Sequence, residues 1–247
     1  MVVLTGTDLY RDIRTDAAAQ RSLQLATHLV VLQDRGLLEL EPALRRKCTV
    51  IYQSAPRLAA AAPPKRVLRI VSVGHLRDEK DPVTFMRAAA RLRHRSDIRF
   101  AQIGAALEPS LEAAARRTQA EYPNYRWLGA LERAATRQQI RNAHLLVNTS
   151  RMEGGAQVIL EAARSSTAVI ASRIPGNCGM LGRRHAGWFE VGDDAHLARL
   201  IERAADDRRF LARLRAQTAA RAPLFEPAEE EKRLLRLIRS ALPSRQP

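Results

Sequence analysis

The chain has 247 residues, of which 46% are hydrophobic and 27% are charged. This composition is typical of a globular protein with one large or two small domains, and it excludes a largely disordered chain. The formal net charge is +15, but only four of the 41 basic residues are lysines and the rest are arginines spread along the sequence. We therefore interpret the charge as a generally basic surface and not as a dedicated groove for a polyanion.

Several classes of protein are disfavoured by simple features. Cys48 and Cys178 are the only cysteines, without disulfide-framework or zinc-cluster spacing, which favours a reducing cytoplasm and predicts no metal site. The first residues lack the pattern of a signal peptide, and no apolar run approaches the ~20 residues that span a bilayer, so secretion and stable membrane insertion are disfavoured. Only eleven residues are aromatic, and none alternates with arginines as a stacking platform for nucleic acid.

Residues 1–55 contain three short strand-like runs, at Val2–Leu4, Leu29–Leu32 and Thr49–Tyr52. After the first run, Thr5-Gly6-Thr7-Asp8 predicts a helix start capped by Thr7 or Asp8, with free N–H groups facing a cleft. Three strands and about two helices are too few for a doubly wound sheet. We therefore interpret residues 1–55 as the C-terminal remnant of a Rossmann-like domain whose beginning is not present.

Residues 56–66 are rich in proline, follow no strand or helix period, and are interpreted as an interdomain linker. Beyond them, strands and helices alternate as in an α/β domain with a parallel sheet. Strands are predicted at Val67–Val73, Arg99–Ile103, Tyr125–Leu128, Leu145–Asn148, Ala168–Ala171 and Trp188–Val191. Helices are predicted at Pro82–Arg93, Pro109–Ala120, Arg133–Asn142, Gly155–Arg164 and Ala195–Ala205. Residues 67–225 thus form one complete Rossmann-like domain, and residues 226–247 add a charged amphipathic helix.

The most informative segment runs from the strand at Asn148 through Glu153, Gly154 and Gly155 to Glu161. The glycines let the backbone approach a ligand, and the free N–H groups of the following helix favour a diphosphate. Glu153 in the turn and Glu161, about two turns into the helix, can accept hydrogen bonds from sugar or ribose hydroxyls. Taken alone, the two acids are also typical of a solvated turn and a helix surface.

A second strand–turn–helix segment is Gly74-His75-Leu-Arg77-Asp-Glu-Lys80, after which Pro82 opens a helix. Lys80 lies at the mouth of this helix, where its point charge can neutralise phosphate, and His75 or Arg77 can assist. An ordinary exposed lysine is the plainer interpretation. Because the chain has only four lysines, one at such a position favours a functional role.

Together these segments resemble the donor-binding domain of the GT-B glycosyltransferases, in particular the retaining enzymes of family four. The resemblance covers about residues 66–225. It rests on the E-x7-E spacing of Glu153 and Glu161, the Gly74–Lys80 loop, the step Trp127-Leu128-Gly129 and Ile174-Pro-Gly176. It implies an α/β fold of GT-B type, with one complete Rossmann-like donor domain, a partial N-terminal domain on the acceptor side, and a C-terminal helix that crosses back to it.

The resemblance also implies roles for single residues. Glu153 and Lys80 are expected to be catalytic, the first on the donor sugar and the second on the diphosphate, and Glu161 is expected to bind the ribose. The donor-binding set is Gly74, His75, Arg77, Lys80, Glu153, Gly154, Gly155, Ala156 and Glu161. His75 stands where the family usually has arginine, and Ser166-Thr-Ala-Val169 replaces Gly-x-Pro-Val, so diphosphate affinity rests more on Lys80. No metal and no cofactor is implied, since the UDP-sugar is a substrate.

Four segments narrow the resemblance to the selenosugar synthases of selenoneine biosynthesis. They are Leu4–Asp12, Gly74–Pro82, Ser150–Ala156 and Ile174–Gly182. This implies transfer of a sugar, N-acetylglucosamine, from its UDP derivative to selenophosphate, with the acceptor held by Thr5, Gly6, Thr7 and Arg11. Two alternatives stay open: a family-four enzyme acting on a hydroxyl of a lipid or polysaccharide precursor, and an inactive fragment or nonenzymatic basic module.

Overall fold

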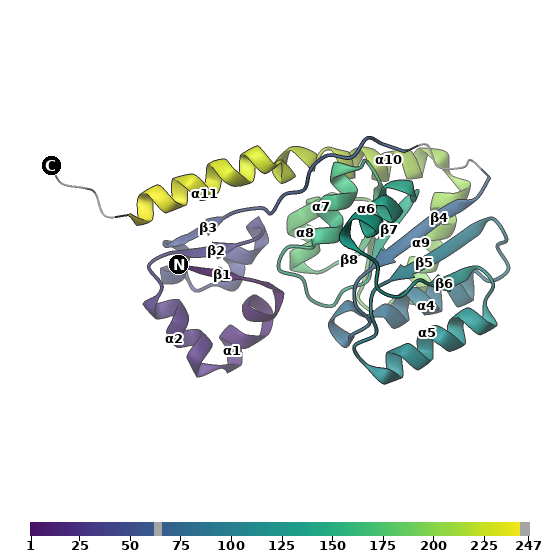
Figure 1. Ribbon diagram of the computed structural model, residues 1–247, viewed down its shortest axis with the longest axis horizontal. Helices are drawn as coiled ribbons and strands as arrows, with labels where there is room; N and C mark the ends of the chain where they lie inside the picture. Colours follow the sequence, from purple (N-terminus) through teal and green to yellow (C-terminus); the bar gives the residue numbers. More distant parts are fainter. Residues whose placement is uncertain (62–65, 243–247) are drawn as a thin grey trace.

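The computed structural model describes residues 1–61 and 66–242, which form two α/β units (Figure 1). Residues 62–65 of the predicted linker and residues 243–247 of the predicted C-terminal segment lie outside the described part. The smaller, N-terminal unit has a parallel sheet of β1 (Val2–Leu4), β2 (Leu29–Val31) and β3 (Cys48–Val50), in that order. Its helical segments are η1 (Asp8–Asp12), α1 (Ile13–Thr15), α2 (Ala17–Leu25), η2 (Asp34–Glu39) and α3 (Pro42–Arg45).

The start of the first helical segment differs from the prediction. Residues are helical from Gly6 onward, and Thr7 makes no capping hydrogen bond with its side chain. Instead, the Asp8 carboxylate accepts hydrogen bonds from the backbone N–H and the hydroxyl of Thr5, at 2.8 and 2.6 Å. The prediction that Thr7 or Asp8 is the N-cap residue is therefore wrong, because the helical turn begins earlier and Asp8 reaches back from within it.

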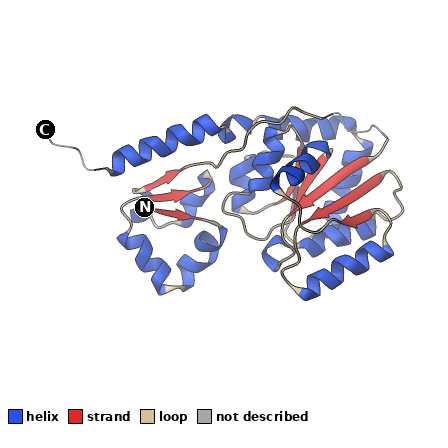
Figure 2. Ribbon diagram, in the orientation of Figure 1, coloured by secondary structure: helices blue, strands red, loops and turns tan. Residues whose placement is uncertain are grey.

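The larger unit contains a six-stranded parallel sheet in the order β6-β5-β4-β7-β8-β9 (Figure 2). Its strands are β4 (Leu68–Val73), β5 (Ile98–Ile103), β6 (Tyr125–Trp127), β7 (Leu145–Asn148), β8 (Ala168–Ser172) and β9 (Trp188–Phe189). In chain order within this unit the arrangement reads 3-2-1-4-5-6, that of nucleotide-binding Rossmann sheets. The direction of winding reverses between β4 and β7, so their carboxyl ends border the crevice where such sheets bind ligands.

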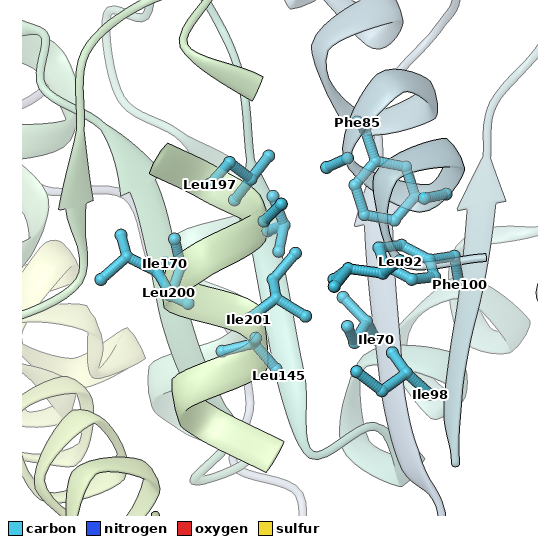
Figure 3. Packing of buried hydrophobic residues seen from close by; sticks show 14 of the residues in the cluster. Ile70, Phe85, Leu92, Ile98, Phe100, Leu145, Ile170, Leu197, Leu200 and Ile201 are labelled. Carbon is cyan, nitrogen blue, oxygen red and sulfur yellow. The ribbon is translucent and has the colours of Figure 1, made fainter. Parts of the chain in front are cut away.

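Helices cover both faces of this sheet. They are α4 (Pro82–Arg91), α5 (Pro109–Glu121), α6 (Arg133–Asn142), α7 (Gln157–Arg164), α8 (Pro175–Leu181), α9 (Asp194–Asp206) and α10 (Arg208–Ala219), with η3 (Asp78–Lys80) and η4 (Ala222–Phe225) in the connections. Alternation along β4 fills two cores, because successive side chains point to opposite faces. Ile70 packs with Phe85, Phe100 and Ile201 on the face of α4 and α9 (Figure 3), whereas Val71 belongs to the opposite cluster.

Several element boundaries differ from the sequence prediction. The helix expected from Gly155 begins at Gln157, so Glu161 lies only about one turn from its start instead of two. The strand expected to reach Val191 pairs only at Trp188 and Phe189. The short helix α8 was not predicted, since its sequence Pro-Gly-Asn-Cys-Gly-Met-Leu has no apolar period. Tertiary packing, not local pattern, therefore determines this part of the unit.

The two units touch through several elements. The final helix, α11 (Pro227–Ala241), leaves the larger unit and passes over the N-terminal one (Figure 1), where Leu237 packs against Val30 and Ile51. In the segment that follows β3, the carbonyl of Ala55 accepts a hydrogen bond from Arg164 Nε of α7 at 3.0 Å. No helix in residues 1–61 or 66–242 is long and apolar enough to cross a bilayer.

Candidate functional site

A cleft of about 240 Å³ lies between the two units, at the carboxyl ends of β4 and β7. Both units contribute to its walls. The N-terminal unit and the segment after it supply Thr5, Gly6, Thr7, Leu32 and Gln53, and the larger unit supplies Arg77, Glu79, Lys80, Met152, Glu153, Gly154 and Gly155. Residues predicted to bind a donor thus line the same space as residues predicted to bind an acceptor.

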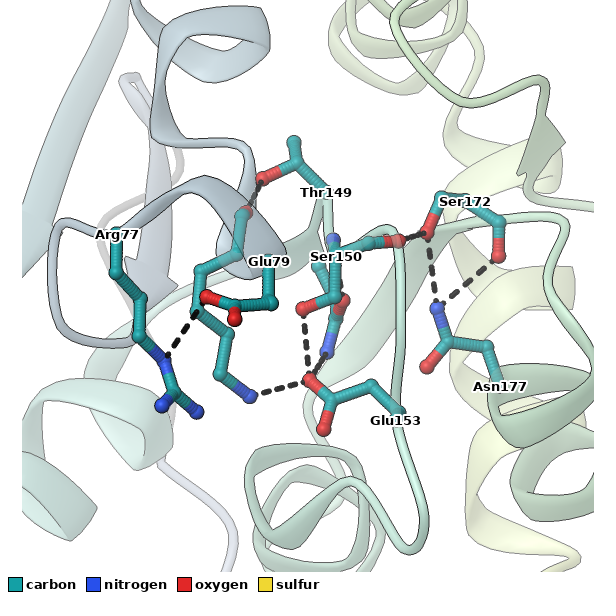
Figure 4. Close-up of polar contacts among 9 residues, drawn as sticks. Arg77, Glu79, Thr149, Ser150, Glu153, Ser172 and Asn177 are labelled. Carbon is teal, nitrogen blue, oxygen red and sulfur yellow. Dashed lines mark hydrogen bonds and ion pairs between the residues drawn. The ribbon is translucent and has the colours of Figure 1, made fainter. Parts of the chain in front are cut away.

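The Glu153 carboxylate is held at one of its two oxygens (Figure 4). Its Oε1 accepts hydrogen bonds from Lys80 Nζ at 2.6 Å, Ser150 Oγ at 2.7 Å and Asn148 Nδ2 at 3.4 Å. Its Oε2 accepts none from the residues that the structure describes. Only 9% of the Glu153 side chain is exposed, against 24% for Lys80. The ion pair is therefore partly shielded from water, while one carboxylate oxygen stays available to a hydroxyl group in the cleft.

Lys80 is positioned by the loop that carries it. A Cβ atom on Gly74 would lie 3.4 Å from both Cγ and Cδ of Lys80, so the lysine stem packs directly beside this glycine. The carbonyl of Lys80 accepts a hydrogen bond from Thr149 Oγ1 at 2.8 Å. The neighbouring Glu79 faces two guanidinium groups, with Arg11 Nη1 at 3.5 Å and Arg77 Nε at 3.9 Å. Positive side chains from both units therefore meet at this edge of the cleft.

A chain of buried hydrogen-bonded polar groups supports the turn that carries Glu153 (Figure 4). Asn177 Nδ2 donates to the carbonyl and the hydroxyl of Ser172, both at 3.0 Å, and the Ser172 hydroxyl donates to the carbonyl of Ser150 at 2.6 Å. Gly176 lies so close that a Cβ there would meet the Glu153 carbonyl at 1.9 Å. The start of α8 and the end of β8 thus fix the turn that carries Glu153.

Some predicted site residues lie outside the cleft. Glu161 is buried, and its Oε1 faces Arg137 Nε at 3.9 Å and Arg133 Nε at 4.0 Å on α6. Burial raises the pKa of the Glu161 carboxyl, and a hydrogen bond from Gln157 and the two arginines partly oppose this. His75 Nδ1 accepts the backbone N–H of Ala105 at 3.2 Å and joins two loops.

Three other predicted residues lie near the cleft without lining it. Gly74 borders a small hollow beneath Lys80, together with Asn148 and Ser150. Ala156 is buried at the start of α7. Arg11 belongs to the N-terminal unit and reaches the cleft through Glu79. The structure therefore gathers Thr5, Gly6, Thr7, Arg77, Lys80, Glu153, Gly154 and Gly155 around one space.

The sequence did not reveal the residues that hold Glu153 or complete the walls. Asn148, Ser150 and Ser172 lie at or just after the carboxyl ends of buried strands, and polar residues at such ends are a signal that points to a site. Leu32 and Gln53 give no comparable signal, because they line the cleft only once the two units have docked. Within the described ranges, no group of three or more His, Cys, Asp or Glu side chains gathers as a metal site requires.

Two α/β units that face each other across a cleft, one of them with a nucleotide-binding strand order, define the GT-B architecture of glycosyltransferases. The chain belongs to the family described as Glycosyl transferases group 1, whose model matches residues 59–222. This match covers the whole sheet of the larger unit and both of its site loops.

Solved structures agree with this architecture. Anabaena HepE, in complex with UDP-glucose, has a TM-score of 0.81 at 14% identity, over 96% of this chain and 72% of its own. The pneumococcal O-GlcNAc transferase GtfA, in complex with UDP and GlcNAc, has a TM-score of 0.79 at 17% identity. The match covers 96% of this chain and 51% of GtfA. TarM of S. aureus has a TM-score of 0.74 at 14% identity, and the match covers 96% of this chain and 49% of TarM. The chain spans about half the length of TarM and GtfA, and at these identities the likeness concerns the fold. No curated protein sequence matches this chain significantly.

Proposed function

We propose that this chain transfers a sugar, N-acetylglucosamine, from its UDP derivative to selenophosphate and so forms a 1-selenosugar, as in selenoneine biosynthesis. The observation that carries the proposal is the shared cleft, where Lys80 and Glu153 of the larger unit face Thr5, Gly6 and Thr7 of the smaller one. Membership of the group 1 glycosyltransferases supports a sugar-transfer reaction. The UDP and UDP-glucose bound to HepE and the UDP bound to GtfA support a UDP-sugar donor.

The donor half of the proposal uses charge and backbone. Lys80, assisted by Arg77, neutralises the diphosphate as it leaves, and the N–H groups of Gly154 and Gly155 approach it from the turn. The free Oε2 of Glu153 accepts a hydroxyl of the donor sugar. Gly74, His75 and Ala156 shape the loops around the diphosphate, while Glu161 accepts the ribose hydroxyls.

The acceptor half follows from the chemistry of selenophosphate. Its selenium is already anionic, so no general base is needed; the task is to hold a highly charged group beside the diphosphate. Thr5, Gly6, Thr7 and Arg11 hold the phosphate oxygens. The selenium electron pair then forms the Se–C bond at the anomeric carbon, the bond from that carbon to the diphosphate oxygen breaks, and UDP leaves with the bonding electrons. The selenosugar formed in this step keeps the phosphate on its selenium.

Mass spectrometry of the reaction products tests this function. We expect a selenium isotope pattern on a hexosamine after incubation with UDP-N-acetylglucosamine and selenophosphate, and its loss in Glu153→Ala. A sugar transferred only to added hydroxyl acceptors would support the alternative family-four enzyme. A UDP-sugar that stays intact with every acceptor would contradict the proposed activity of this chain.

Asn177 offers a test of how Glu153 is positioned. Asn177→Ala removes two buried hydrogen bonds at Ser172, and we expect the turnover number to fall about ten-fold while the free energy of unfolding drops by about 1–3 kcal/mol. Asn124→Ala is a matched control, since Asn124 is also buried, also donates two hydrogen bonds through Nδ2 and also leaves its Oδ1 without a partner among the described residues. Steady-state kinetics and urea unfolding should show similar stability losses but a rate loss only in Asn177→Ala.

Replacing Glu161 with glutamine is expected to raise the stability of the fold and to weaken donor binding. Burial raises the pKa of its carboxyl in the folded state, so the fold is favoured while Glu161 is protonated and loses stability as pH rises above the ordinary value of 4.5. Glu161→Gln removes this loss. In urea unfolding between pH 4 and 7, the free energy of unfolding of the variant should therefore rise relative to that of the wild type as pH rises.

If Glu161 binds the ribose, UDP affinity should fall about ten-fold in the same variant. An unchanged UDP affinity would remove Glu161 from the donor site.

A further inference from the structure

A second cavity, of about 450 Å³, lies at the amino ends of the strands of the six-stranded sheet, opposite the cleft. Leu68 is the first residue of β4, while Asp97 and His144 directly precede β5 and β7, and all three line this cavity. In a parallel sheet these positions mark the amino ends of the strands, whereas the cleft with Lys80 and Glu153 lies at the carboxyl ends. The C-terminal part of α9 and the outer helix α10 complete the wall.

Three arginines line this cavity without a carboxylate partner. They are Arg66, which precedes β4, and Arg208 and Arg215 on α10. None of the three guanidinium groups forms an ion pair or a hydrogen bond with a described residue. The Nε of Arg215 is buried and has no acceptor there. A buried guanidinium N–H without an acceptor is costly, and a ligand in the cavity that carries an acceptor oxygen would remove this cost.

The nearby carboxylates are engaged elsewhere. Asp97 lines the cavity, but both of its oxygens accept hydrogen bonds from Arg95, at 2.9 and 2.8 Å. Asp206 also binds Arg95, at 2.7 Å. His144 accepts the backbone N–H of Arg69 through Nδ1 at 3.0 Å. Arg95 is shared by the carboxylates of Asp97, Glu202 and Asp206. Of these three only Asp97 lines the cavity, so the three lining arginines still outnumber the lining carboxylates.

The rest of the lining is apolar. Val67, Leu68, Ala204, Ala205 and Leu211 supply side chains that can pack against hydrocarbon. The volume lies within the range of about 300–1,000 Å³ that is typical of small-molecule sites. Planar guanidinium groups bind phosphate oxygens in pairs, which makes arginine the usual residue for such recognition.

We infer that this cavity binds an organic phosphate with a short apolar body, its phosphate held by Arg208 and Arg215 and its apolar part packed against Leu68 and Leu211. This site is additional to the proposed transferase function and separate from the cleft. Because the two sites lie at opposite ends of the strands, a ligand bound in one site leaves the other site open.

Calorimetric titration of the full chain with octyl phosphate, near 150 mM salt, tests the inference. We expect saturable binding of one molecule per chain, weakened about ten-fold or more in Arg215→Ala and in Arg208→Ala, since each removes a charge-assisted contact. Arg213→Ala is the matched control, because Arg213 is an exposed arginine on the same helix and does not line the cavity. We expect its affinity to stay within two-fold of the wild type. Octanol should bind much more weakly than octyl phosphate.

Three results would overturn the inference: no saturable binding of octyl phosphate, an equal loss in Arg213→Ala, or displacement of octyl phosphate by UDP. The second would show attraction to the basic surface alone, and the third would place the ligand in the cleft. Thermal unfolding of each variant shows whether it is folded, and Arg215→Lys keeps the charge if Arg215→Ala does not fold. Loss of sugar transfer without loss of octyl phosphate binding would concern the proposed function and not this site.

Discussion

Glu153→Gln is expected to lower the rate of sugar transfer about a hundred-fold or more and to leave UDP affinity within a few-fold. The amide keeps the shape of the side chain but removes the negative charge that pairs with Lys80 at 2.6 Å. A preorganised charge near the reacting centre contributes roughly two to three orders of magnitude to a rate. Single-turnover kinetics gives the rate of transfer, and calorimetry gives the affinity for UDP.

A double-variant cycle with Lys80→Met sharpens this prediction. Lys80 and Glu153 touch directly, so their effects should not add: the double variant should lose less activity than the two single losses combined. Glu112→Gln is a control for the loss of one carboxylate, since Glu112 pairs with Arg116 on the exposed face of α5. Single losses that add fully would show that the pair does not act as one unit, and a wild-type rate in Glu153→Gln would remove Glu153 from the reaction.

Gly154→Ala is expected to reduce transfer about a hundred-fold by separating the two units. A Cβ on Gly154 would lie 2.5 Å from the nitrogen of Gly6 and 2.6 Å from the carbonyl carbon of Thr5. Both contacts are with backbone of the N-terminal unit, so the added methyl is accommodated only if the units move apart. A displacement of about 1 Å between reacting groups costs on the order of 100-fold in rate.

UDP binding and the rate of sugar transfer, measured together for Gly154→Ala, distinguish a displacement of the two units from unfolding of the protein. UDP binding should persist within a few-fold, because Lys80 and Glu153 belong to the same unit, whereas the rate of transfer between the units should fall. Gly192→Ala is the control: its φ is +80°, so alanine is strained there, but a Cβ would meet no atom within 4 Å. If Gly154→Ala transfers sugar as fast as Gly192→Ala, the close approach of Gly154 to Gly6 has no part in catalysis.

The sequence predicted the strands β7 and β8 of the larger unit well because they are buried on both faces. Runs such as Leu145–Asn148 and Ala168–Ser172 are fully buried and therefore read as continuous apolar segments. Lys80 and Glu153 were predicted from two strand–turn–helix segments and from the resemblance to the GT-B donor domain. Each lies in the loop that follows a strand, and the two strands are neighbours in the sheet, so both side chains reach one crevice.

Features that depend on docking or on helix packing were not visible in the sequence. Glu161 was expected two turns into its helix, but α7 begins at Gln157 and the buried Glu161 carboxylate faces the arginines of α6, which no sequence pattern indicated. The helix α8 has no apolar period, yet its Asn177 supports the turn of Glu153. Neither arrangement is encoded within one short segment, because each depends on elements distant in the chain.

Calorimetric titration with UDP tests the central claim, that the cleft around Lys80 and Glu153 binds the nucleotide of a UDP-sugar donor. We predict one saturable site per chain, weakened about thirty-fold in Lys80→Met through loss of a charge-assisted contact to the diphosphate. Lys232→Met, which removes an exposed lysine from α11, should change the affinity less than two-fold. No saturable binding, or an equal loss in both lysine variants, would contradict this assignment.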